Sequence, residues 1–331
     1  MQLNLLEKSI LATIGYYDIF DYPLTGFEVF KYLINPLHII SQLGIKKGMK
    51  LEPVRETSFL DILKILGSGN LEDFIEEKNG LYFLKGKGNL VKQRIERQKI
   101  AVSRWKKVYR VIKFLQVCPF IKMIAVCNSL AIDNSKQKAD IDFFIIIRKG
   151  RIWLTRFLIT FIIWSLGQRR HGQKIAGRVC LSFYITDQAL NLQSLTIEPY
   201  DIYLAHWVLE IKPVYWRNQT YNQFISENKW LKDYFFNFEQ TLNERHPQFK
   251  TNGFLSLIQK SSEKILGGWF GGLIEKLFRL VQRHRINRKI TPHKIPTAVV
   301  VSDKILKFHE IDRREFFQEE FRKRLEILTS I

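Results

Sequence analysis

The sequence predicts a chain of the α+β class, in which a mixed sheet with helices is flanked by two further parts. Residues 1–88 combine apolar positions at helical spacing with a closing hairpin signal. Residues 89–192 begin with a long basic helix and then hold apolar runs of strand length around a polar loop. Residues 193–331 are rich in aromatics and predict a mainly helical region. For 331 residues, two or three domains are expected.

The composition is that of a folded, strongly basic protein. Hydrophobic residues make up 46% of the chain, more than a disordered chain contains. Lys and Arg number 52 against 32 Asp and Glu, which gives a formal charge of +20. This charge attracts nucleic acid, nucleotides or an anionic membrane surface without choosing among them, and a solvated basic surface explains it equally well.

The cysteines and the N-terminus predict a cytoplasmic protein. Cys118, Cys127 and Cys180 are isolated and predict reduced thiols, neither a disulfide framework nor a zinc site. Acidic and polar residues interrupt the N-terminus where an export signal would be apolar. The longest apolar run, residues 152–166, is shorter than the roughly 20 residues of a spanning helix, so a buried helix is expected. Membrane-surface contact through this run or residues 269–281 is a secondary alternative.

The elements of residues 1–88 are a helix over 3–17, a second helix beginning at Thr25, a third over 58–66 and a hairpin. Thr25 and Glu28 match a capping box, and Asn79-Gly80 matches a tight turn before a β-favouring run. Three helices and a terminal hairpin resemble the winged-helix fold. That fold serves both DNA binding and protein contacts, and both functions stay open.

A long basic helix follows over residues 85–122. Apolar residues at helical spacing predict that one face packs on the core. The cations are then either solvated or beside a phosphate-rich ligand. The next helices are expected over 200–211, 221–238 and 255–287, the last broken by glycines, and over 312–328 after a short strand near 298–308.

The chemistry is concentrated in residues 121–150. A short apolar run ends at Asn128-Ser129, a polar loop follows, and Asp140-Ile141-Asp142 opens a second apolar run that predicts a buried strand. Strand alternation places both aspartates on one face. Two carboxylates at this spacing repel each other unless a cation lies beside them. Mg²⁺ prefers oxygen ligands and retains substrate phosphates, so the pair suits a Mg²⁺–triphosphate complex.

This segment resembles the DNA polymerase β-like nucleotidyltransferase superfamily. Its motif is a strand, a Gly-Ser turn that begins a helix, and Asp-x-Asp on the next strand. The flanking segments are similar to a group of bacterial and archaeal proteins with a winged-helix-like N-terminal part. The resemblance implies that Ser129, beside Asn128, binds nucleotide phosphate, and that Asp140 and Asp142 hold Mg²⁺.

Two departures from that pattern bear on activity. Asn128 stands where the superfamily has glycine, and asparagine is the ordinary residue that best tolerates positive φ. Active members usually carry a third carboxylate on a later strand, but the expected strand over 179–185 has no acid. Ser182 is the polar side chain expected to face the site there, and Asp187 would substitute only if the strand end curls back.

Two functions therefore stay open. One is Mg²⁺-dependent transfer of a nucleotidyl group from an NTP to an unknown acceptor, with release of pyrophosphate. The other is a catalytically degenerate protein that binds nucleotide or nucleic acid. The cations after the apolar helix, namely Arg169, Arg170, His171 and Lys174, form a basic loop or reach the triphosphate. His206 and His309 lack metal-ligand spacing. The sequence has no Walker A motif, Rossmann fingerprint or nucleophile elbow.

Overall fold

The computed structural model describes residues 3–43, 57–238, 249, 253–288 and 294–329, and it has the α+β class that the sequence predicts. The described residues of the first part form four helices and three short strands. In chain order they are α1 (Leu5–Asp18), β1 (Leu24–Thr25), α2 (Gly26–Lys31), α3 (Pro36–Gln42), α4 (Phe59–Leu66), β2 (Ile75–Lys78) and β3 (Leu81–Leu84). The strands form an antiparallel sheet in the order β1-β3-β2. The predicted Thr25–Glu28 capping box and the Asn79-Gly80 turn are both present.

The central feature is a six-stranded mixed sheet in the order β7-β4-β5-β6-β9-β8. Its strands are β4 (Ile121–Cys127), β5 (Ile141–Ile147), β6 (Val179–Thr186), β7 (Lys212–Trp216), β8 (Val299–Val301) and β9 (Ile305–Phe308). Among the strands that the structure describes, β5 and β6 alone pair in parallel. The sheet takes β7, β8 and β9 from beyond residue 192, so the mainly helical region predicted from 193 onward also completes this sheet.

Helices cover both faces of the sheet. Phe144 and Ile146 of β5 face a core that includes α7 (Ile202–Glu210) and α8 (Thr220–Glu227). Phe143 and Ile145 face the opposite core, which includes α5 (Leu90–Leu115) and α6 (Ile152–Ser165). Because both faces are buried, β5 is apolar at nearly every position.

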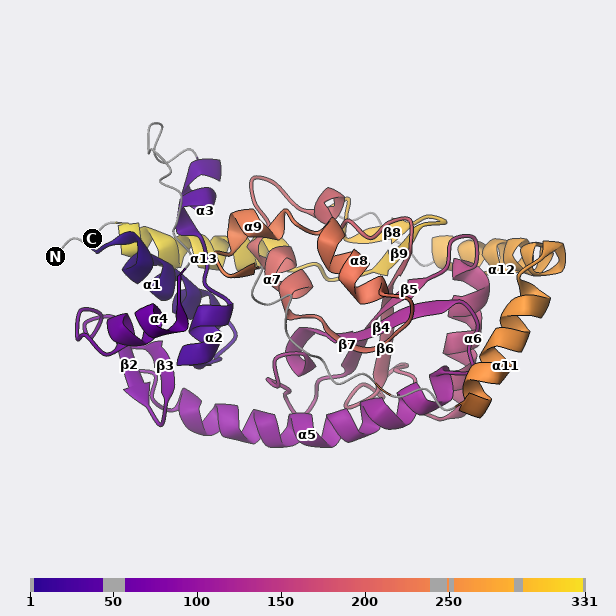
Figure 1. Ribbon diagram of the computed structural model, residues 1–331, viewed down its shortest axis with the longest axis horizontal. Coiled ribbons are helices and arrows are strands. Elements are labelled where there is room, and N and C mark those ends of the chain that lie inside the picture. The colour runs from indigo at the N-terminus through magenta and orange to yellow at the C-terminus, as the bar shows by residue number, and fades with distance from the viewer. Residues whose placement is uncertain (1–2, 44–56, 239–248, 250–252, 289–293, 330–331) are drawn as a thin grey trace.

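The remaining helices frame this body (Figure 1). They are α9 (Leu231–Tyr234), α11 (Gly253–Leu266), α12 (Trp269–Asn287) and α13 (Arg314–Thr329). α11 and α12 form a hairpin against α6, with the predicted glycine break between them. α13 returns to α1, where Arg324 lies 2.9 Å from Asp18 and Phe321 is fully buried. Within the described residues, no helix has the length and hydropathy to cross a membrane.

Candidate functional site

The predicted acidic pair forms a compact cluster at the start of β5. Asp140 immediately precedes the strand, and Asp142 is its second residue. One ligand atom each from Asp140, Asp142 and Cys180 lie within 4.8 Å of one another. In the described parts of the chain, no other acid, histidine or cysteine residues form a group of three this close. The two carboxylates therefore lie on one face of the strand, as alternation predicts.

Cys180 enters the cluster because β6 runs parallel to β5 and pairs Cys180 with Asp142. Burial, followed by the nearby Asp142 charge, raises the pKa of the Cys180 thiol to about 12. The thiol is therefore neutral at pH 7. A neutral thiol is a poor ligand for a hard cation, so the two carboxylates are the donors that fit Mg²⁺.

The charge on Asp142 is poorly compensated. Burial and then the charge of Asp140 raise the pKa of Asp142 to about 6, against hydrogen bonds from Asn128 and Cys180 and the charge of Arg170. A divalent cation between the two aspartates would remove their repulsion and favour the ionised form.

Arg170 neutralises only one member of the pair. Its Nη1 lies 2.6 Å from Asp140 Oδ2 and 3.7 Å from the sulfur of Cys180. Arg170 comes from the loop between α6 and β6, and its side chain is 45% exposed against 16% for Asp140. An exposed arginine on a loop is free to exchange a carboxylate for a phosphate when a ligand arrives.

The turn after β4 presents Asn128 to the site. Asn128 begins a short 3-10 helix, Asn128–Leu130, and has φ 58°, the conformation expected at the position of the superfamily glycine. Its side chain bonds Asp142 and lines a cavity. Ser129 does not line that cavity, and its carbonyl accepts a hydrogen bond from the Asn134 amide at 2.7 Å. Asn128, and not Ser129, is the turn residue in contact with the cavity.

Cations of α5 hold the segments that carry the cluster. Arg104 donates to the carbonyl oxygens of Lys136 and Gln137, both at 2.8 Å, and also to those of Ala139 and Asp140. Lys107 donates to the carbonyl of Gly177 at 2.8 Å. Part of the basic helix therefore positions the loops before β5 and β6.

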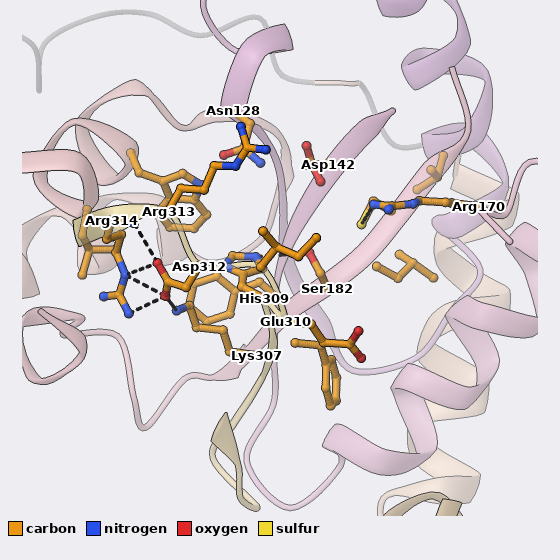
Figure 2. Close-up of a pocket in the computed structure, with 18 of the residues that line it drawn as sticks. Asn128, Asp142, Arg170, Ser182, Lys307, His309, Glu310, Asp312, Arg313 and Arg314 are labelled. Atoms are coloured by element: carbon orange, nitrogen blue, oxygen red, sulfur yellow. Dashed lines mark hydrogen bonds and ion pairs between the residues drawn. The ribbon is translucent and has the colours of Figure 1, made fainter. Parts of the chain in front are cut away.

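The cluster opens into a cavity of about 710 Å³ (Figure 2). Its walls come from the sheet, the loop around Arg170, α7 and residues 307–317. Basic side chains lining it are Arg156, Arg169, Arg170, His171, Lys307, Arg313 and Arg314. Aromatic side chains lining it are Phe183, Tyr203, Trp207, Phe308 and Phe317.

Ser182 and Asp187 have different surroundings. Ser182 lines the cavity, and its Oγ lies 3.3 Å from Nε2 of His309, whose pKa burial lowers to about 3. Asp187 lies beyond the opposite end of β6, where its carboxylate accepts a hydrogen bond from the Lys149 amide at 2.8 Å. The strand end does not curl back, so the structure keeps Asp187 away from the cluster.

Two cavity carboxylates come from a segment that the sequence pattern does not connect with the site. Asp312 is held by Arg314 at 2.7 Å and faces Lys307 at 3.7 Å. Glu310 is exposed and makes no ion pair with any residue that the structure describes. In Figure 2, Ser182 lies between Glu310 and Asp142. No local pattern marks residues 307–317 as part of this site, because only the pairing of β9 with β6 brings them there.

Comparison of the chain with protein-family models, curated proteins and solved structures gives no match. The ligand of the cavity is therefore inferred from the chemistry of the residues that line it.

Proposed function

We propose that the cavity binds a nucleoside triphosphate as its Mg²⁺ complex and that the protein transfers the nucleotidyl group to an acceptor, releasing pyrophosphate. One observation carries the proposal: a single cavity combines Asp142, the member of the carboxylate pair that lines it, with a basic wall and an aromatic wall, and Asp140 lies directly beside Asp142. These three surfaces match the metal, the phosphates and the base of such a ligand.

Asp140 and Asp142 would hold the metal. Two protein carboxylates are a usual contribution to a Mg²⁺ site, with phosphate oxygens and water completing the shell. The bound ion would neutralise charge on the triphosphate during attack by an acceptor hydroxyl. Binding would also relieve the repulsion that raises the pKa of Asp142.

The basic wall would bind the phosphates. Arg156 supports this assignment because its half-buried guanidinium donates to Gln282 and has no carboxylate partner among the described residues. It lies 5.0 Å from the Phe308 ring and 5.9 Å from the Tyr184 ring, and burial lowers its pKa. A desolvated cation of this kind gains most from an anionic ligand.

The aromatic wall would receive the base. Tyr203 and Phe317 stack with ring centroids 4.7 Å apart, and Trp207 lines the same cavity. Aromatic faces accept any of the nucleobases by stacking, so this wall supplies affinity without a strict choice of base.

A nucleotide-binding protein without transfer activity is the second candidate. It is supported by Cys180 and Ser182, which occupy the part of β6 where a third carboxylate would face the site. The ion pair between Arg170 and Asp140 supports it as well, because it competes with a metal.

Titration with each NTP in Mg²⁺ and in EDTA tests the binding proposal. We expect Mg²⁺-dependent binding to the wild type, strong loss in Asp142→Asn and no loss in the matched Asp187→Asn control. Equal binding by Asp142→Asn would rule out the assigned metal site. Pyrophosphate release with RNA, protein and small alcohols as acceptors then separates the candidates, because a pure binder releases none.

The N-terminal part points to a protein partner. We infer a winged-helix-like arrangement from its order of helix, strand, helices and hairpin. Its α4 exposes Leu60 and Leu63, and its hairpin carries Glu76 and Glu77, a combination that suits protein contact better than a phosphate backbone. Tight, salt-dependent DNA binding that is lost on Lys64→Glu would contradict this inference.

A further inference from the structure

The exposed apolar surface of the described residues is concentrated at one end of the molecule. Most of the large apolar side chains that face solvent belong to α6, α11 and α12. These helices lie together at the end opposite the N-terminal part (Figure 1). A concentration of this size is unusual for a surface with no function.

On α12 the apolar residues form one continuous stripe. Trp269, Leu273, Leu277 and Leu280 recur every three or four positions and are between 58% and 83% exposed. This spacing keeps them on one side of the helix. The other side of α12 is buried at Gly271 and Glu275.

α11 and α6 extend this surface. The exposed apolar residues of α11 are Phe254, Leu257, Ile258 and Ile265. On α6, Phe157, Phe161 and Trp164 are exposed at helical spacing. Phe157 stacks on Phe278 of α12 with centroids 4.2 Å apart, so the α6 stripe adjoins the hairpin. We call the exposed apolar residues of α6, α11 and α12 the docking face.

The exposed charges of α11 and α12 have one sign, and the nearby acid Asp303 is paired with Arg279 of α12 at 2.8 Å. The acids of the hairpin point inward: Glu263 pairs with Arg217 at 2.6 Å, and Glu275 accepts the amides of Trp153 and Leu154. The exposed cations make no ion pair with any described residue. They are Lys260, Lys264, Lys276, Arg283, Arg285 and Arg288.

The hairpin is held firmly with this face outward. Arg151 donates to the carbonyl oxygens of Leu266, Gly267 and Gly268 at 3.1, 2.9 and 3.1 Å. A Cβ on Gly271 would lie 1.8 Å from the Leu266 carbonyl oxygen, so this close turn requires glycine. The apolar stripe is therefore a fixed outward surface.

We propose that the docking face lies flat on an anionic lipid bilayer. The apolar stripes enter the boundary between headgroups and acyl chains, and the flanking cations contact the anionic headgroups. The exposed Trp269 at the tip of the hairpin suits the polar–apolar boundary of a bilayer. A bilayer accounts for the exposed cations of α11 and α12 and for the breadth of the face over three helices.

Flotation of the full chain with vesicles tests the proposal. We expect it to float with phosphatidylcholine vesicles that contain phosphatidylglycerol, and much less with phosphatidylcholine alone. Replacing Leu273, Leu277 and Leu280 by Ser should reduce the bound fraction roughly 10-fold or more. The double variant Arg283→Glu and Arg285→Glu should lose the preference for anionic vesicles.

Matched controls use exposed residues elsewhere. Val102→Ser and the pair Lys106→Glu and Arg110→Glu lie on α5 and should leave flotation unchanged. Circular dichroism checks that each variant folds. Flotation of the triple Ser variant equal to the wild type would overturn the proposal. So would a wild type that ignores both vesicles, whether or not sedimentation shows that it dimerises through this face.

Discussion

The buried Asp201 and the half-buried Asp142 lie near the same cavity but have opposite electrostatic surroundings. Asp201 accepts hydrogen bonds from Arg314 at 3.0 Å and from the amides of Leu204 and Ile197 at 2.8 and 3.2 Å. Burial raises the pKa of Asp201, and the charge of Arg314 opposes that rise. For Asp142, burial acts together with a second carboxylate, Asp140.

The charge of Asp201 stabilises the fold through its ion pair with Arg314, whereas the charge of Asp142 is available to a bound cation. Arg314 links Asp201 and Asp312 and thereby ties the start of α13 to α7. Asp142 makes no ion pair with any residue that the structure describes, because Arg170 contacts Asp140. An uncompensated carboxylate raises the free energy of the metal-free folded protein. Binding of a cation beside it lowers that free energy again.

The largest expected effect comes from removing Arg314, the cation that pairs with Asp201. Arg314→Met leaves Asp201 and Asp312 without their main cation, and we expect a loss of about 3–5 kcal/mol in the free energy of unfolding. Denaturant unfolding measures it. Arg322→Met, on the exposed side of α13, is the matched control and should change little. Similar losses for both variants would contradict the contrast.

The next effect concerns Asp142, the aspartate whose charge is poorly compensated. Asp142→Asn should weaken binding of the Mg²⁺–nucleotide complex roughly 100-fold, because one of two metal carboxylates is lost. Isothermal titration calorimetry measures the affinity. Asp187→Asn, which changes an acid beyond the far end of β6 and outside the cavity, should bind as the wild type does.

The same substitution should stabilise the metal-free protein in a pH-dependent way. With its pKa near 6, native Asp142 keeps its proton above the pH at which the unfolded chain releases it, so stability falls as pH rises from about 4 to 6. Asp142→Asn removes this loss and should gain roughly 2–3 kcal/mol at pH 8 and little at pH 4. Thermal unfolding in EDTA at both pH values tests it. A destabilised variant at pH 8 would show that Asp142 is compensated after all.

The smallest expected effect lies on the basic wall. Arg313 is exposed, lines the cavity and makes no ion pair with any described residue, so Arg313→Gln should not alter stability. It should weaken nucleotide binding about 3- to 10-fold, with the effect shrinking at high salt. Arg110→Gln on α5 is the control. An unchanged affinity would remove Arg313 from the phosphate site.

Sequence predicted the local half of this site. Alternation along β5 placed Asp140 and Asp142 together, and the positive φ of Asn128 followed from its place in the motif. Cys180 could not be predicted as their neighbour, because its register depends on how the α6 crossover sets β6 beside β5.

The rest of the cavity could not be predicted either, because it depends on pairing between strands that are far apart in the sequence. Arg313 and Glu310 reach it only because β9 joins β6, more than a hundred residues away in sequence. The charge pattern of α5 also does not show which of its cations are solvated and which bind other parts of the chain. Arg104 is of the second kind, because it donates to carbonyl oxygens of the loop before β5. Side-chain chemistry fixes what such residues can bind, while tertiary structure fixes which partner they meet.

Helix α6 has one further consequence, since it borders both proposed ligand surfaces. Arg156 lines the cavity, and its neighbour Phe157 stacks against the lipid-facing hairpin. If nucleotide binding shifts α6, it changes the affinity for the membrane. Thermodynamic linkage then requires membrane binding to change the affinity for nucleotide by the same factor. Nucleotide titrations with and without anionic vesicles should therefore yield the same coupling factor as vesicle titrations with and without nucleotide.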